Sequence, residues 1–93
     1  MDLDHKRFGA RLTYHRRLRG VKQGALAKTC EMGINALTQL ETGQRAPRAE
    51  EVEGLADAMG LTEAERAELR ADAVATVEAM ARDERGFGPG EAP

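Results

Sequence analysis

Residues 22–43 decide the fold, and they read KQGALAKTCEMGINALTQLETG. The first part of this stretch carries a short apolar face made of Leu26, Ala27 and Cys30. In the second part, apolar side chains recur at the spacing of one helical face: Met32, Ala36, Leu37 and Leu40. Gly43 then ends the segment, as glycine commonly ends a helix. The stretch therefore predicts a short helix, a brief turn and a second helix.

The sequence on either side predicts three further helices. Upstream, apolar side chains at helical spacing precede Gly20: Phe8, Leu12, His15 and Leu18. Downstream, the clearest amphipathic pattern in the chain ends at Gly60: Val52, Leu55, Ala56 and Met59. Thr62 and Glu65 form a capping box for a last helix that we expect to run to about Asp83. The predicted apolar stripe of that helix is Leu69, Ala73, Val74, Val77 and Met80.

No stretch predicts a strand, so the fold class is all-α, a compact domain of five helices with an extended last helix. We expect residues 1–70 to form the domain and residues 71–84 to extend the last helix. Residues 85–93 are rich in Gly and Pro and are predicted to be a disordered tail. No apolar run approaches the roughly 18 residues of a membrane span, and the start of the chain does not resemble a signal peptide. A cytoplasmic protein without internal disulfides is expected, because Cys30 is the single cysteine.

Charge is divided unevenly along the chain, although the net charge is only −2. Residues 1–48 hold ten Lys and Arg against four acidic residues, a balance of +6. Residues 49–93 hold four Arg against twelve acidic residues, a balance of −8. This division favours a polyanion-binding surface in the first half, and the alternative is that both halves are solvated helix faces.

A short helix joined to the next by a tight turn is the helix-turn-helix pattern, although spacing alone does not separate it from an ordinary helical hairpin. Several motifs stand in one register: Gln23, Leu26-Ala27, Glu41-x-Gly43 and Pro47. With the residues around them, from Phe8 to about residue 70, they resemble the lambda-repressor-like domain of the Xre/Cro family. The resemblance implies a homodimeric transcriptional regulator, in the manner of a repressor, that binds double-stranded DNA with its second motif helix in the major groove.

The resemblance also implies roles for individual residues. The base-reading positions are Gln23, Ile34, Asn35, Thr38 and Gln39. Asn and Gln amides can bond adenine, whereas Ile34 can contact only a thymine methyl group. The flanking residues that suit phosphates are Lys22, Thr42, Gln44, Arg45 and Arg48.

Other positions are assigned to the scaffold of the motif. Arg16 and Glu41 match a partly buried ion pair that joins the first helix of the domain to the recognition helix. Glu31 stands where the family usually has the turn glycine, so we expect it to be left-handed or to change the turn. Gly33 is an acceptable N-cap. Because the recognition helix carries no basic residue, we expect affinity for DNA to depend on flanking residues and on dimerisation.

The remaining reactive side chains do not form a catalytic or metal site by their spacing. His5 and His15 lack further ligands at zinc spacing, and His15 is predicted to pack in the core. Cys30 is expected to act as a small buried hydrophobe, with a redox-sensing thiol as the alternative. We therefore expect no enzyme activity, no metal and no cofactor.

The last helix is longer than the motif requires. We expect a dimer contact there, made by Leu69, Val74, Val77 and Met80, with a frayed helix end as the alternative. A second function is left open beside DNA binding. In it, the chain is an antitoxin-like or adaptor module that binds a protein partner through the acidic last helix.

Overall fold

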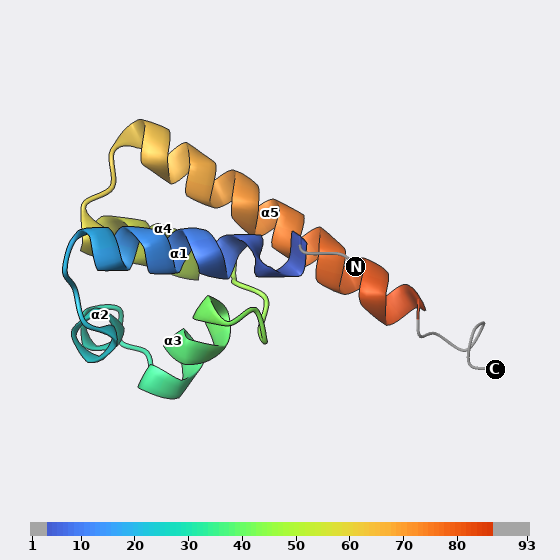
Figure 1. Cartoon of the computed structure of the whole chain (residues 1–93), viewed down its shortest axis with the longest axis horizontal. Helices are drawn as coiled ribbons and strands as arrows, with labels where there is room; N and C mark the ends of the chain where they lie inside the picture. The colour runs from blue at the N-terminus through green and yellow to red at the C-terminus, as the bar shows by residue number, and fades with distance from the viewer. Residues whose placement is uncertain (1–3, 87–93) are drawn as a thin grey trace.

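In a computed structural model, the structure describes residues 4–86, and every element in this range is a helix (Figure 1). A short 3-10 helix (η1) and five α-helices follow in order: η1 Asp4–Lys6, α1 Arg7–Leu18, α2 Gln23–Thr29, α3 Ile34–Glu41, α4 Ala49–Met59 and α5 Glu63–Gly86. The predicted all-α fold with five helices is confirmed. α5 continues to Gly86, three residues beyond the expected end of the last helix near Asp83. The rest of the predicted tail, residues 87–93, lies outside the described residues.

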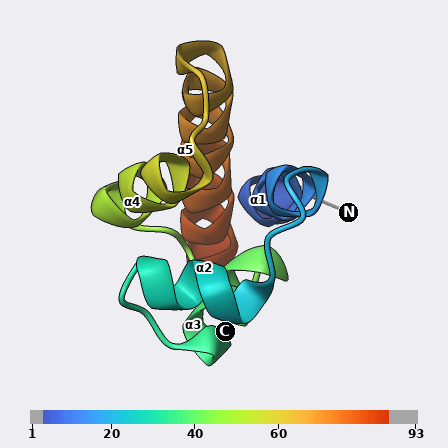
Figure 2. The same cartoon turned by 90° about the vertical axis from the view of Figure 1, so that its left-hand side faces the viewer.

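The helices close around one apolar core. α5 lies between α1 and α4, and the α2–α3 pair covers one end of this layer (Figure 2). The fully buried leucines come from all five helices: Leu12, Leu26, Leu37, Leu40, Leu55 and Leu69. They occupy the apolar positions at helical spacing, so the period of the sequence determines which face of each helix turns inward.

Gly9 sets how closely α1 approaches α3. A Cβ atom built on Gly9 would clash with the backbone carbonyl oxygens of Leu40 and Glu41, at the end of α3. No side chain fits in this space, so the glycine lets one helix backbone rest on another. This contact is one of the features that fix α3 relative to the rest of the domain.

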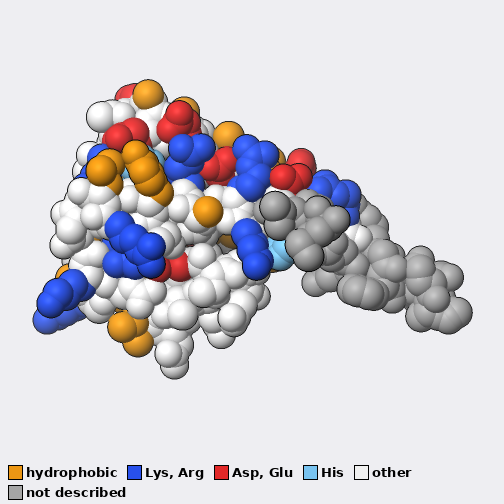
Figure 3. Space-filling view, viewed as in Figure 1, with side chains coloured by type: hydrophobic (Ala, Val, Ile, Leu, Met, Phe, Trp, Pro, Cys, Tyr) orange, Lys and Arg blue, Asp and Glu red, His pale blue; other side chains and the backbone are white. Residues whose placement is uncertain are grey.

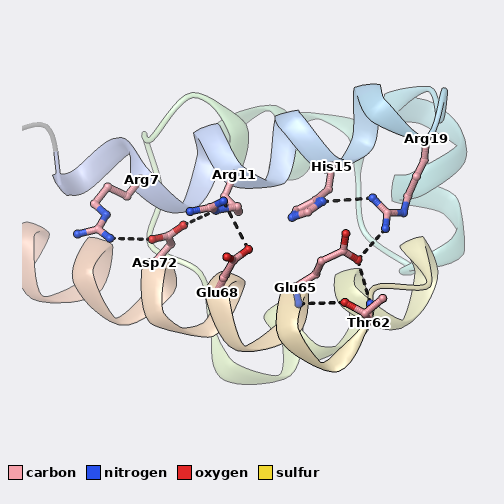
Figure 4. A network of polar contacts seen from close by, with 8 residues as sticks. All are labelled: Arg7, Arg11, His15, Arg19, Thr62, Glu65, Glu68 and Asp72. Carbon is pink, nitrogen blue, oxygen red and sulfur yellow. Dashed lines mark hydrogen bonds and ion pairs between the residues drawn. The ribbon is translucent and has the colours of Figure 1, made fainter.

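An ion-pair seam joins α1 to α5 (Figure 4). Arg7 and Arg11 donate to the Asp72 carboxylate over 3.0 and 2.7 Å, and only 5% of that acidic side chain is exposed. About two helical turns from the Arg11–Asp72 pair, Arg19 donates to Glu65 over 2.8 Å. Much of the charge that separates the two halves of the sequence is therefore neutralised inside one molecule.

The inward face of α5 differs from the predicted stripe. Asp72, Thr76 and Ala79 are buried on it, whereas Val74 and Val77 are 57% and 42% exposed. The Thr76 hydroxyl oxygen accepts from the Phe8 backbone N–H over 3.0 Å and donates to the carbonyl of Asp4 over 2.9 Å. Leu69 and Ala73 of the predicted stripe are buried. The prediction left polar residues out of the buried face, and two of them, Asp72 and Thr76, are buried there with hydrogen-bond partners.

The start of α5 matches the predicted capping box. The Glu65 backbone N–H donates to the Thr62 hydroxyl over 3.1 Å, and the Thr62 backbone N–H donates to the Glu65 carboxylate over 3.0 Å. These reciprocal bonds satisfy backbone donors at the helix start that have no partner within the helix.

His15 is buried at the α1–α5 seam, as predicted. Its Nδ1 atom lies 3.2 Å from a guanidinium nitrogen of Arg19, and its Nε2 atom is buried without a hydrogen-bond partner among the described residues. Burial lowers the pKa of His15 below its ordinary value of 6.5. The charged groups that face the ring are Glu65, Arg19, Arg11 and Glu68, and Tyr14 packs edge-on against it.

We predict that the protein loses stability as the pH falls below 6.5 because of His15. The unfolded chain takes up a proton there before the folded chain does, so the unfolded state is favoured down to the lowered pKa of the folded state. Urea unfolding followed by circular dichroism between about pH 8 and pH 5 measures this effect. In the His15→Leu variant the part of the pH dependence just below 6.5 should vanish. Parallel curves for the two proteins would contradict the prediction.

Candidate nucleic-acid interface

The turn between α2 and α3 is built around a left-handed glutamate. Glu31 has φ 56° and is the only described non-glycine residue with a positive φ, which confirms one of the two expectations for this position. The Met32 N–H donates to the carbonyl of Ala27 over 2.9 Å, and the Glu31 N–H donates to that of Lys28 over 3.1 Å. These bonds close the end of α2 and direct the chain into α3, at a backbone cost of about 1 kcal/mol for Glu31.

Gly33 precedes α3 as its N-cap in an extended conformation. Leu37 and Leu40 anchor the helix in the core, while Asn35 and Gln39 are exposed on its outer side. Ile34, the first residue of the helix, is 49% exposed. α3 therefore presents two amides and one aliphatic side chain to solvent.

Two threonines lie beside this face, and each hydroxyl bonds to its own helix. Thr38 is half-buried and donates to the carbonyl of Ile34 over 2.9 Å. Thr42 is exposed and donates to the carbonyl of Thr38 over 2.8 Å. With its hydrogen committed in this way, each hydroxyl offers its oxygen lone pairs to an outside donor.

A polar clamp, defined here as Arg16, Gln23, Glu41 and the Val21 carbonyl, joins α1, the start of α2 and the end of α3. The guanidinium of Arg16 donates to both carboxylate oxygens of Glu41, over 2.6 and 3.2 Å. It also donates to the carbonyl of Val21 over 2.9 Å. The Arg16 and Glu41 side chains are 12% and 6% exposed, so this contact is largely shielded from solvent.

Gln23 belongs to the clamp and is less available than the other predicted base-reading residues. Its side-chain N–H donates to the Glu41 carboxylate over 2.8 Å. This bond holds the amide at the first position of α2, and its carbonyl oxygen and second N–H are the groups left to meet a ligand. Sequence reasoning assigned Gln23 only to contact with DNA and missed its bond to Glu41.

The predicted phosphate-binding residues fall into two groups. Lys22, Thr42, Gln44 and Arg48 are exposed, and the two cations form no ion pair with the described residues. Arg45 instead donates to both carboxylate oxygens of Glu51 over 3.3 and 2.9 Å. Burial alone would raise the pKa of Glu51, but hydrogen bonds from Arg45 and from the Arg48 backbone lower it. A role for Arg45 at a phosphate would compete with this internal pair.

Two further cations near the motif were missed by sequence reasoning. Arg17, near the end of α1, and Lys28, in the last turn of α2, are exposed and form no ion pair with described residues. Lys and Arg side chains stand out over α2 and the adjoining part of α1, whereas basic and acidic side chains alternate along the α1–α5 seam (Figure 3). The cations on the motif side are therefore the ones left for an outside anion.

Neither a metal-binding group nor a membrane span is found in the part of the chain that the structure describes. No three of its His, Cys, Asp and Glu side chains are grouped in a way that could hold an ion, and no helix is long and apolar enough to cross a bilayer. Cys30 is half-buried, with its Sγ atom 3.6 Å from the carbonyl of Gly54, and burial raises the pKa of its thiol. This environment favours the packing role over the redox role.

A family model described as a helix-turn-helix domain matches residues 7–69, which run from the start of α1 into α5. The curated proteins and the solved structures gave no match.

Proposed function

Because the chain belongs to the helix-turn-helix domain family, we propose that it is a sequence-specific transcriptional regulator that places α3 in the major groove of DNA. The observation that carries this proposal is the way α3 is presented. Its apolar side is fixed in the core, its end is held by the polar clamp, and its outer side carries Asn35 and Gln39 with no competing contact to the described residues.

The chemistry of that outer side supports base reading. The amides of Asn35 and Gln39 lie about one helical turn apart and have the donor and acceptor that adenine requires. Ile34 at the start of α3 is suited to a thymine methyl group. These three residues are the proposed reading positions, with Thr38 and the Gln23 carbonyl oxygen beside them.

Affinity is assigned to the flanks of the motif because α3 itself has no basic residue. Lys22, at the N-cap of α2, and Arg48, at the N-cap of α4, are the proposed phosphate contacts, with Thr42 and Gln44 between them in the chain. Arg17 and Lys28 join this set on the strength of their exposure. Phosphate contacts position the protein and make its affinity depend on salt.

We further propose the Xre/Cro type of regulator, which acts as a homodimer and represses transcription. The Arg16–Glu41 contact and the helix order support this assignment. A homodimer would increase the affinity for DNA, which an uncharged recognition helix alone does not provide, by doubling the phosphate contacts on two half-sites. The acidic-helix alternative is weakened, because Glu65 and Asp72 are already paired with arginines of α1.

The proposal predicts a difference between reading and positioning residues. Gln39→Ala should cost about 1–3 kcal/mol of discrimination at one base pair, because its amide is the group that contacts the base. Lys22→Ala should weaken binding to all sequences and lower the salt slope by about one phosphate contact, because its charge interacts with the backbone. Selection from a randomised duplex pool, followed by gel shifts at two salt concentrations, measures both effects.

The unfolding midpoints of both variants serve as the control, since neither side chain has a partner among the described residues whose loss would change stability. Equal effects of the two substitutions on every sequence would contradict the division of roles. No shift of the pool at low salt would refute DNA binding itself.

A further inference from the structure

The outward face of α5 is exposed in the monomer and is nevertheless made mostly of apolar residues. Between residues 67 and 81, the side chains opposite the buried Asp72 and Thr76 form one face, and all but the last, which is half-buried, are exposed: Ala67, Arg70, Ala71, Val74, Val77, Glu78 and Ala81. Apart from one arginine and one glutamate, this face is made of alanine and valine. Val74 and Val77 are among the exposed large apolar side chains of the molecule.

The order of these residues is self-complementary about Val74. Arg70 and Glu78 stand one helical turn on either side of it, and Ala67 and Ala81 stand about two turns away. When two such helices run antiparallel around a two-fold axis at Val74, each residue meets the position equally far on the other side. Ala67 then faces Ala81 of the partner subunit, and Ala71 faces Val77 of the partner subunit. Arg70 faces Glu78 of the partner subunit, and the two-fold axis produces this pair twice.

The charged groups of this face are free to pair in this way. Glu78 forms no ion pair with the described residues. Arg70 donates through Nε and Nη2 to Glu53 over 2.6 and 3.0 Å, so its Nη1 group is left with hydrogens to donate. An arginine has enough donors to bind Glu53 and a second carboxylate together.

The surface beside Val74 is hollowed and apolar. Two shallow depressions of about 310 and 230 Å³ lie between α5 and the start of α4. Both are lined by Ala49, Val52, Ala73 and Val74, and the larger extends to Val77 and Glu78. Side chains from a second copy would therefore fill space between the two helices as well as cover α5.

We propose that two copies of this chain pair through antiparallel α5 helices, with Val74 on the two-fold axis and Arg70 bound to Glu78 of the partner subunit. This rests on the homodimer proposed above and specifies its surface, direction and register. Small residues along the face allow the two helix axes to approach to about 8 Å, the short end of the usual range. Leu69 drops out of the predicted dimer contact because its side chain is fully buried in the core. Met80 drops out as well, because it is half-buried and lies one helical turn after the buried Thr76, away from this face.

The test uses charge reversal in the full chain, followed by sedimentation equilibrium without DNA. Arg70→Glu places two pairs of glutamates in opposition, and Glu78→Arg places two pairs of arginines in opposition. Each variant alone should raise the dimer Kd by about tenfold or more. An equimolar mixture of the two should dimerise like the unmodified protein, because each mixed dimer restores both opposite-charge pairs. The reversal Arg17→Glu on α1 should leave the dimer Kd unchanged.

The mixture controls for misfolding, because a variant that had failed to fold would not dimerise when the other variant is added. Recovery of the dimer in the mixture therefore shows that both single variants are folded and that only their charges prevent pairing. Single variants that dimerise normally, or a mixture that stays monomeric, would overturn the register. An unmodified protein that stays monomeric at high concentration would overturn the dimer altogether. A gel shift on selected DNA reports on DNA binding separately, so its failure is distinguishable from failure of this interface.

Discussion

Gly9→Ala is expected to destabilise the fold by about 3 kcal/mol or more, the upper end of what overpacking usually costs. The added methyl group would meet the backbone carbonyls of Leu40 and Glu41, which cannot rotate away as a flexible side chain can. Relief requires α1 and α3 to separate, and this would weaken the polar clamp as well. The chain has no tryptophan, so urea unfolding is best followed by far-UV circular dichroism.

Gly54→Ala is the matched control. Gly54 lies inside α4, and a Cβ atom there meets nothing within 4 Å. The same glycine-to-alanine change should therefore stabilise the protein by up to about 1 kcal/mol, through helix propensity alone. A Gly9→Ala variant as stable as the unmodified protein would show that the two helices do not rest on each other at this point.

Arg16→Ala is expected to cost about 3–5 kcal/mol of folding stability. Glu41 would be left with a charged side chain that is only 6% exposed, and Gln23 would remain as its sole side-chain donor among the described residues. Removing one partner of a shielded pair costs more than the pair contributes, because the remaining charge loses its compensation. Chemical unfolding measures the loss.

The neighbouring Arg17→Ala is the control for Arg16→Ala and should change stability by less than about 0.5 kcal/mol, since Arg17 is exposed and unpaired with described residues. The double variant Arg16→Ala with Glu41→Gln should recover part of the loss, because it removes the stranded charge. Equal losses in the single and the double variant would mean that packing, and not charge, accounts for the effect.

Apolar spacing predicted the helices well because each buried face is continuous along its helix. It failed on α5, where Asp72 and Thr76 are buried with partners on α1 and η1 that lie more than 60 residues away in the chain. Burial of a polar group depends on what meets it, and this cannot be read from the residue's own helix. Val74 and Val77 of the predicted stripe are exposed instead, and their assignment to a dimer contact stays a prediction.

The uneven charge along the sequence also fits an ion-pair seam between two helices, and the spacing of the charged residues supports this interpretation. Arg7, Arg11 and Arg19 fall on one side of a helix, four and eight positions apart. Glu65, Glu68 and Asp72 fall on one side of another helix, three and four positions apart. Two such rows suit a seam between helices, which the structure contains (Figure 4). For the proposed DNA interface, sequence alone could not reveal that Arg45 is paired with Glu51 while Lys22 and Arg48 form no ion pair with the described residues, because this depends on where the α3–α4 connection lies.

The polar clamp also has a consequence for how the regulator can change over generations. It holds α3 through Glu41, and the buried leucines hold α3 in the core. The side chains of Ile34, Asn35 and Gln39 form no hydrogen bond or ion pair with the described residues. Under the proposed function, mutations at these three positions would alter the preferred DNA site while the scaffold keeps its stability. A duplicated copy of the gene could thus acquire a new target through a few substitutions that leave the stability of the fold unchanged. Substitutions at Arg16, Gln23 or Glu41 would instead destabilise the fold and be removed by selection.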